Sequence, residues 1–237
     1  MGRLPVYRIK ASLRRRLPAA RFVLISCLVL AAFACMQTTY DYKGHQVFNP
    51  DYLFYLESSW RDQWQKPDKV LQALEISKTD VIADIGAGGG YFTELFSRYV
   101  GRTGRVYATD VQDVMIQRLQ ERVRDKGLDN VEVVRGGFDD PMLPEACCSL
   151  VFFSSVYKEI DGRVGYMKKI RKTLSPGGRV AIIEYRPEAL AIGPPMGMRL
   201  SPDRVIEELF AAGFTLVKSH NFLSREYFLI FVPEDSE

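Results

Sequence analysis

Four glycines stand within five positions of the chain, at 86 and at 88–90, directly behind the apolar run 81–85. Glycine adopts positive backbone angles without strain, and its missing Cβ lets another molecule approach the main chain. A dinucleotide fingerprint would need glycine where Tyr91 or Thr93 stands, and a phosphate P-loop would need a lysine that "GGYFTE" lacks. Because no pyrophosphate site fits, the loop is better matched to a nucleoside that carries an amino-acid tail.

The apolar runs of the chain show how this loop is held in place. Extended, β-branched runs alternate with amphipathic helical patterns, which predicts a mostly parallel sheet with helices on both faces. Ligands of such sheets bind at the carboxyl ends of the strands, where the first strand-to-helix turn lies. The predicted strands are 80–85, 105–110, 131–136, 150–155, 179–185, 214–220 and 226–233, and the predicted helices are 91–100, 112–127, 163–174 and 202–212.

Two local signals refine this α/β fold. Ser201 is a preferred N-cap residue, and Pro202 fits the first position of the last helix. The link "NFLSR" between the last two strands is too short for a helical crossover. We therefore expect a seven-stranded sheet whose last strand is antiparallel.

The pattern D-x-G-x-G-x-G, present as "DIGAGGG" at 84–90, resembles the glycine motif of the class I S-adenosylmethionine-dependent methyltransferases. The resemblance extends over most of residues 67–233 and implies a Rossmann-like methyltransferase sheet with S-adenosylmethionine as cofactor. Narrower similarity of "WQKPDKVLQAL" and "RLSPDRVIEELFAAGF" points to bacterial methyltransferase-domain proteins, several of which carry export signals.

The resemblance also assigns cofactor-binding residues. It implies that the glycine loop carries the methionine part of the cofactor and that the acid ending the second strand accepts hydrogen bonds from both ribose hydroxyls. A carboxylate suits a vicinal diol because it can accept two bonds side by side. Residues after the third strand are implied to hold the adenine. The set is Asp84, Gly86, Ala87, Gly88 and Gly90 for the loop, Asp110 and Val111 for the ribose, and Phe138 and Asp139 for the adenine.

The acceptor is expected near the ends of the fourth and fifth strands. Methyl transfer from a sulfonium is a direct displacement, so alignment and exclusion of water matter more than a dedicated base. "SSVYKE" lacks the Asn/Asp-Pro-Pro-Tyr run of enzymes that methylate nucleobase or glutamine nitrogens, which leaves small-molecule O-, C- or S-methylation. Tyr157 is the predicted catalytic residue, with simple packing as the alternative. The opening is predicted to involve Glu159, Glu184, Tyr185 and Arg186, with the loop 186–202 as a substrate lid or only a connector.

Residues 1–40 carry seven basic residues and no acid, so 25 basic and 29 acidic residues remain in the rest of the chain, a balance of −4. That balance argues against nucleic acid as a partner, because phosphate neutralisation needs a basic face. The apolar run 22–36 behind the arginines predicts a signal peptide, a lipoprotein signal ending at Cys35, or a short membrane anchor; an organelle transit peptide fits less well. We expect a membrane-associated or exported protein of the bacterial periplasm, with attachment to the cytoplasmic face of the membrane as the alternative.

The predicted organisation is a segment 1–40 followed by a methyltransferase domain 41–237. Within the domain, 41–66 is expected to form a helical lid, or else to pack Trp60, Trp64 and Tyr55 on the core. Cys147 and Cys148 lack zinc-ligand spacing, so they are interpreted as structural and no metal site is predicted. Arsenite methylation is set aside because it needs more cysteines around the site.

These features together predict a methyltransferase that acts on a small-molecule acceptor, which can be lipophilic. A non-catalytic module that binds S-adenosylmethionine or S-adenosylhomocysteine, as a sensor or scaffold at the membrane, is the alternative, because an exported domain would leave the compartment that makes the methyl donor. An NAD-dependent oxidoreductase is disfavoured by the glycine spacing.

Overall fold

The computed structural model describes residues 38–40, 44, 46–58, 60–188 and 193–234. Within these ranges no helix is both long and apolar enough to cross a membrane. The predicted signal or anchor segment lies outside them, except for its last three residues.

A seven-stranded sheet forms the centre of the molecule, in the order β5-β4-β3-β6-β7-β9-β8. All neighbours from β5 to β7 are parallel, and β9 is antiparallel to both β7 and β8, as expected for the last strand. Successive strands are added toward one edge from β3 to β5 and toward the other edge from β6 onward. This switch in strand order, between β3 and β6, creates the crevice where such sheets bind ligands. The strands are β3 (Val81–Ile85), β4 (Arg105–Asp110), β5 (Val131–Arg135), β6 (Cys148–Ser154), β7 (Leu174–Tyr185), β8 (Phe214–His220) and β9 (Glu226–Pro233).

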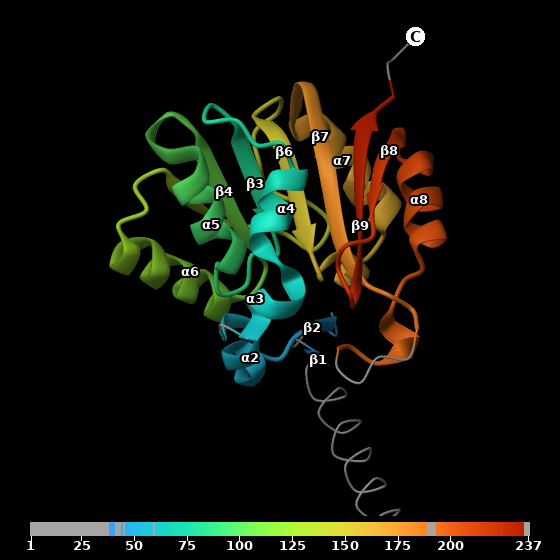
Figure 1. The fold of residues 1–237 in the computed structure, drawn as a ribbon, viewed down its shortest axis with the longest axis horizontal. Coiled ribbons are helices and arrows are strands. Elements are labelled where there is room, and N and C mark those ends of the chain that lie inside the picture. The colour runs from blue at the N-terminus through green and yellow to red at the C-terminus, as the bar shows by residue number, and fades with distance from the viewer. Residues whose placement is uncertain (1–37, 41–43, 45, 59, 189–192, 235–237) are drawn as a thin grey trace, which may run out of the picture.

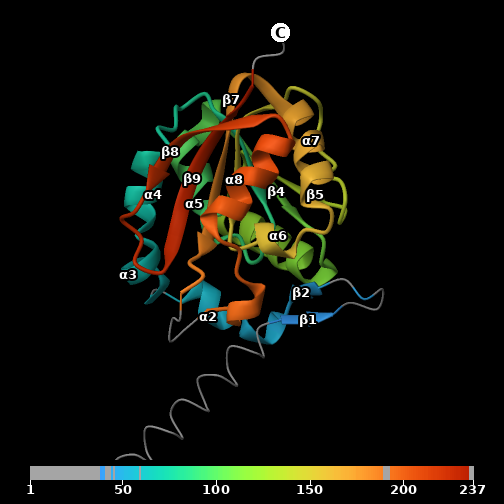
Figure 2. The same cartoon turned by 90° about the vertical axis from the view of Figure 1, so that its right-hand side faces the viewer.

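Helices cover both faces because successive strand residues point to opposite sides of the sheet. Ile82 and Phe152 pack on one face with α4 (Pro67–Ala73) and α5 (Tyr91–Val100). Ala83 and Phe153 pack on the other with α7 (Arg163–Thr173) and α8 (Pro202–Ala211). Figure 2 shows α4 and α7 on opposite sides of the sheet. The remaining helix, α6 (Asp113–Lys126), lies along β4 and β5.

The start of α8 confirms the predicted cap. The Ser201 hydroxyl accepts a hydrogen bond from the backbone N–H of Arg204 at 3.2 Å, and Pro202 occupies the first helical position. Short 3₁₀ turns, η2 (Gly101–Thr103), η3 (Tyr157–Glu159) and η4 (Met196–Met198), complete the connections, and η3 directly follows β6.

The N-terminal elements lie against the edge of the sheet where the parallel strands end (Figure 1). They are β1 (Thr38–Tyr40), β2 (Gln46–Phe48), η1 (Pro50–Tyr52), α2 (Leu53–Glu57) and α3 (Trp60–Gln65). The antiparallel pairing of β1 with β2 was not predicted, and it places the expected boundary at 40/41 inside a hairpin. The segment 41–66, expected to be helical, does contain α2 and α3. Its residues 46–48 form a strand instead, because β-branched and aromatic residues favour extended pairing.

Candidate functional site

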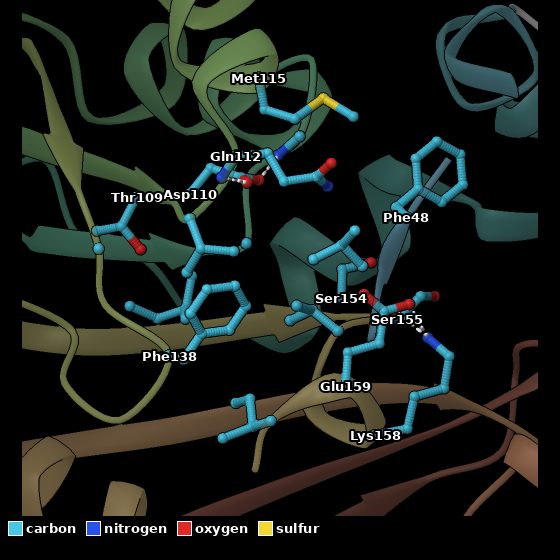
Figure 3. Close-up of a pocket in the computed structure, with 18 of the residues that line it drawn as sticks. Phe48, Thr109, Asp110, Gln112, Met115, Phe138, Ser154, Ser155, Lys158 and Glu159 are labelled. Atoms are coloured by element: carbon cyan, nitrogen blue, oxygen red, sulfur yellow. Dashed lines mark hydrogen bonds and ion pairs between the residues drawn. The ribbon is translucent and has the colours of Figure 1, made fainter. Parts of the chain in front are cut away.

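A cavity opens at the carboxyl ends of the central strands. One side is formed by the turns after β3, β4 and β5, and the other by the chain after β6 and by the N-terminal elements. Figure 3 shows Asp110, Gln112 and Phe138 on one side, with Ser155, Lys158 and Glu159 across from them. A second, smaller cavity adjoins the first and shares Arg61, Gly86, Gly88 and Ser154 with it.

The glycines of the loop serve different purposes. A Cβ on Gly86 would lie 2.3 Å from the Val156 side chain, and one on Gly89 would lie 2.2 Å from the Glu57 carboxylate of α2. Gly86, which has φ +64°, is therefore required by the protein's own packing, whereas at Gly89 the flexible end of the Glu57 side chain could move aside. At Gly88, which has φ +56°, a Cβ would meet no atom within 4 Å. Gly88 is thus the position where the bare backbone faces open space in the cavity wall.

Asp110 ends β4 and is held by two backbone donors. Its Oδ2 accepts a hydrogen bond from the Gly88 N–H at 2.9 Å, and its Oδ1 accepts one from the Gln112 N–H at 3.0 Å. The side chain is buried, and burial raises its pKa to about 6 despite these donors. Each carboxylate oxygen has a second lone pair, so the group can still accept bonds from a ligand in the cavity.

Asp84 lies in the smaller cavity, beside the glycine loop. It accepts a hydrogen bond from the Thr93 hydroxyl at 2.6 Å, and burial raises its pKa to about 7. A buried carboxylate whose hydrogen-bond donors come from one neighbouring residue, Thr93, is a suitable partner for a cationic group. Of the other residues predicted for the loop and ribose, Ala87 borders this smaller cavity and Val111 the larger one.

The two residues predicted to hold the adenine separate in the structure. Phe138 lines the cavity together with Gly136 and Gly137. Asp139 is not among the lining residues: its side chain is 90% exposed and lies 3.4 Å from the Lys169 ammonium. The expectation that Asp139 faces the cavity is therefore not met, because the turn after β5 directs it toward α7.

Tyr157, the predicted catalytic residue, also lies away from the cavity. Its side chain is fully buried in the core beneath the sheet edge, packs edge-on against Phe153, and donates a hydrogen bond to Glu208 at 3.2 Å. It does not line the cavity, so the structure does not support a direct catalytic role. The cause is the phase of the η3 turn, which directs Tyr157 inward and brings the next two residues to the cavity.

Lys158 and Glu159 thus occupy the place expected for Tyr157. The Lys158 ammonium lies 3.3 Å from Glu159 and 4.0 Å from Glu184. Burial acts to lower the pKa of Lys158, but these two carboxylates outweigh it and raise that pKa, so the ammonium stays charged. Tyr185 lines the cavity as predicted, Glu184 lies beneath it, and Arg186 is not a lining residue.

Comparison with known proteins agrees with this geometry. A family model described as "Methyltransferase domain" matches residues 82–178. A crystal structure of an S-adenosylmethionine-dependent methyltransferase from Aquifex aeolicus superposes with a TM-score of 0.75 at 26% identity, covering 78% of this chain and 98% of the other. Residues 82–178 thus form a methyltransferase domain, and the fold is that of the class I S-adenosylmethionine-dependent methyltransferases.

Other similarities cover less of the chain. The ubiquinone/menaquinone biosynthesis C-methyltransferase UbiE of Proteus mirabilis is 26% identical over 116 residues, which are 48% of this chain and 46% of that protein. The match thus spans about half the length of that curated relative. The mitomycin 7-O-methyltransferase MmcR, at 15% identity and a TM-score of 0.60, covers 72% of this chain and 53% of its own and shows the fold alone.

The methyltransferase cavity fits the cofactor of its family. The open space beside Gly88 would be filled by a Cβ, and the anchored Asp110 carboxylate is directed by two backbone donors. Phe138 supplies an aromatic surface on the same side. These residues would hold the nucleoside, while Asp84 and the loop backbone would hold its amino-acid tail.

Several residues that line the methyltransferase cavity were not predicted. Val47, Phe48 and Arg61 come from the N-terminal elements, whose contact with the cavity depends on long-range packing. Ser155 also lines it and has φ +59°, an uncommon conformation for a residue with a Cβ. Glu159 lines the cavity as predicted for the opening, and Lys158 could have been inferred in the same way, as a polar residue directly after a predicted strand.

Proposed function

We propose that the protein transfers the methyl group of S-adenosylmethionine to a small-molecule acceptor bound in the same cavity. The observation that supports this most is that one cavity is lined both by Gly88, Asp110 and Phe138 and by the facing group Ser155, Lys158 and Glu159. The first set suits the nucleoside, and the second provides hydrogen-bonding groups for an acceptor.

When bound, the cofactor supplies a methyl group on a sulfonium for direct displacement. The protein's contribution is alignment in a site shielded from water. Val47 and Phe48 of β2 shield it on the side of the N-terminal elements. The charged Lys158 ammonium favours an acceptor oxygen that carries negative charge, and the Glu159 carboxylate beside it can accept a proton.

The acceptor we propose is lipophilic and aromatic. Besides the charged group, the cavity wall includes Phe48, Ile160, Tyr185 and Pro194, which offer flat and apolar surface. The curated relative named for ubiquinone and menaquinone biosynthesis also supports a ring that bears oxygen substituents, although the match covers about half of that protein.

We also propose that residues 1–40 attach the protein to a membrane or direct its export. The basic residues and the apolar run 22–36 support this placement. A reporter fused to the C-terminus, active on only one side of the inner membrane, would show the side on which the domain lies. Loss of membrane association on deleting residues 1–37 is expected, and an unchanged distribution would contradict the proposal.

The function is tested with the full chain purified in mild detergent. Isothermal calorimetry with S-adenosylhomocysteine should give saturable binding, and S-adenosylmethionine with a labelled methyl group should label members of a panel of phenols and hydroquinones with alkyl tails. Lys158→Met should lose transfer but keep nucleoside binding, because Lys158 lies on the acceptor side. No binding of either nucleoside would refute the proposal. Binding without transfer to any member of a broad acceptor panel would favour the non-catalytic module.

A further inference from the structure

Glu226 is a fully buried acid at the edge of the sheet where the cavity opens. It is the first residue of β9, and because β9 runs antiparallel to β7, it pairs with Tyr185 at the carboxyl end of β7. Its side chain has no exposed surface, and a carboxylate is costly to bury unless it is hydrogen-bonded. The reversed strand therefore places a buried carboxylate beside the ends of the parallel strands.

Two side chains hold Glu226 in a defined orientation. The Gln65 amide of α3 donates to both of its oxygens, at 3.1 and 3.3 Å, and Gln65 is itself fully buried. The Ser155 hydroxyl donates to its Oε1 at 3.0 Å. One of these partners belongs to the core, and the other belongs to the cavity wall.

Ser155 connects the buried acid to the cavity. It directly follows β6 and lines the cavity, and the Lys158 ammonium donates to its carbonyl (Figure 3). Its φ of +59° is held by a hydrogen bond from its N–H to the Ile183 carbonyl at 2.8 Å. A serine hydroxyl donates one hydrogen bond and has two lone pairs. Because its proton is directed at Glu226, its oxygen can accept a hydrogen bond from a hydroxyl group in the cavity.

The surroundings of Glu226 suit a group that takes up and releases a proton. Burial raises its pKa to about 7, and the Glu184 carboxylate on β7 acts in the same direction. The positive charge of Arg61 on α3 and the hydrogen bonds described above act in the opposite direction. Lys158 also interacts with the charge of Glu226. A base is most effective when its pKa lies near the working pH.

We propose that Ser155 and Glu226 form a proton relay: the Ser155 hydroxyl receives the proton of an acceptor hydroxyl group and passes its own proton to Glu226. This relay rests on the proposed function. The acceptor O–H bond breaks as its proton moves to Ser155 Oγ, and the Ser155 proton moves to Glu226 Oε1. The acceptor oxygen uses the freed electron pair to bond the methyl carbon, while the pair of the broken carbon–sulfur bond stays on sulfur. Ser155 ends unchanged, and Glu226 later releases the proton to water.

The relay gives the acceptor proton a route that leaves the neighbouring ion pair intact. Glu159 is paired with the Lys158 ammonium at 3.3 Å. If the proton passes to Glu226, Lys158 keeps this partner and stays charged beside the acceptor oxygen. The acceptor class that fits is therefore a neutral phenol or hydroquinone, whose hydroxyl proton must leave during methyl transfer.

The test compares two acceptors with the full chain in mild detergent: an alkylated hydroquinone, and an alkylated nitrophenol that is already ionised at pH 8. With the hydroquinone, Glu226→Gln should lower kcat about 100-fold, as for loss of a general base, and leave KM within about threefold. Ser155→Ala should cause a similar loss, and the double variant should lose no more than either single variant. With the ionised nitrophenol, which has no proton to release, each variant should keep kcat within about threefold of the unaltered protein.

The pH profile is a readout that a purely structural role would not change. At saturating S-adenosylmethionine, kcat for the hydroquinone should fall below about pH 7, because Glu226 must be ionised to accept a proton. Glu226→Gln should lose this dependence, and Glu226→Asp should retain part of the rate. In infrared spectra of the unliganded protein, the carboxyl band that titrates near pH 7 should decrease in Glu226→Gln. An unchanged band would contradict the role of Glu226.

Ser149→Ala is the matched control. Ser149 lies on β6, its hydroxyl donates to the Asp80 carboxylate at 2.9 Å, and it lines neither cavity. The control therefore removes the same kind of hydrogen bond far from the acceptor side. It should leave kcat and the pH profile unchanged.

The outcomes separate the relay from the proposed function. Full activity of Glu226→Gln with the hydroquinone, or equal losses with both acceptors, would overturn the relay and leave the proposed function intact. Transfer by the unaltered protein to the nitrophenol alone would do the same. S-adenosylhomocysteine binding shows whether each variant folds, and if Glu226→Gln does not, Ser155→Ala decides, since alanine keeps the Cβ and adds no backbone strain. If the unaltered protein transfers no methyl group to any acceptor, the proposed function fails and the relay with it.

Discussion

Asp110 and Gly88 are joined by a hydrogen bond of 2.9 Å that links the end of β4 to the glycine loop after β3. The bond fixes one carboxylate oxygen of Asp110, while the Gln112 N–H fixes the other. The Asp110 carboxylate and the Gly88 backbone, which both face the nucleoside site, are therefore held in a fixed arrangement relative to each other. Disturbing either partner should affect ligand binding through the same cavity wall.

Replacing Asp110 with alanine should weaken S-adenosylhomocysteine binding by about 1–3 kcal/mol, because a buried acceptor of two ligand hydrogen bonds is lost. Calorimetry on the full chain measures the change. Asp139→Ala is the control, since the exposed Asp139 side chain lies outside the cavity, and it should leave the affinity within about threefold. A larger loss for Asp139→Ala than for Asp110→Ala would restore the adenine role expected from sequence.

Gly88→Ala should separate ligand binding from backbone strain. A Cβ at Gly88 enters open cavity space, and alanine at φ +56° costs about 1–2 kcal/mol of stability. Gly127→Ala at φ +60° is a matched control, because its Cβ also meets nothing but lies at the end of α6, outside both cavities. Thermal unfolding should shift similarly in the two variants, whereas only Gly88→Ala should lose nucleoside affinity. Equal affinities would show that the space beside Gly88 is not used.

Tyr157→Phe tests whether Tyr157, at the start of η3, has a structural rather than a catalytic role. Removing the hydroxyl deletes one hydrogen bond to Glu208, which keeps its contacts with Arg163 and Arg204, so we expect a loss of about 0.5–1.5 kcal/mol in unfolding free energy. Nucleoside binding and methyl transfer should be retained. A variant that unfolds normally and binds the nucleoside but transfers no methyl group would contradict the structural role.

Nucleoside affinity should rise with pH. Burial raises the pKa of Asp110 to about 6 and that of Asp84 to about 7, above the value of about 3.9 for an unfolded aspartate. Binding requires both groups to be ionised, so affinity should increase from about pH 5 to pH 8 and then level off. In the unliganded protein the sign is opposite for stability: these raised values favour folding at low pH, and their contribution is lost as pH rises from about 4 to 7.

Calorimetric titrations of S-adenosylhomocysteine at a series of pH values would measure this dependence. Asp110→Asn should remove the part centred near pH 6 and leave the part centred near pH 7. An affinity that stays constant or falls between pH 5 and 8 would show that neither carboxylate must be charged to bind the nucleoside.

Much of the fold could be predicted because it depends on local patterns. All seven strands of the main sheet and the helices α5 to α8 were predicted close to their observed ranges, since apolar runs, caps and glycine breaks are local signals. The insertion of β9 between β7 and β8 was not predicted, because strand order depends on which edges are free once the sheet assembles.

The candidate site also contains residues whose positions could be predicted from local patterns and residues whose positions could not. Residues adjacent to a strand end, such as Gly88 and Asp110, face the cavity as expected because the strand itself directs them. Tyr157 and Asp139 do not, since each lies in a turn where a rotation of one residue changes the side that a side chain faces. Arg61 gave no local signal, because its place in the cavity wall arises from packing against residues more than 20 positions away.

By itself, the sequence determined the sheet, the glycine loop and the acid that ends β4, because each follows from the alternation of side chains or from the special freedom of glycine. Long-range packing is the reason that Lys158 rather than Tyr157 faces the cavity and that the N-terminal elements complete its wall. The first outcome depends on the phase of the η3 turn. The second depends on the joint burial of Arg61 from α3, Asp84 from β3 and Glu226 from β9, which no local sequence pattern records.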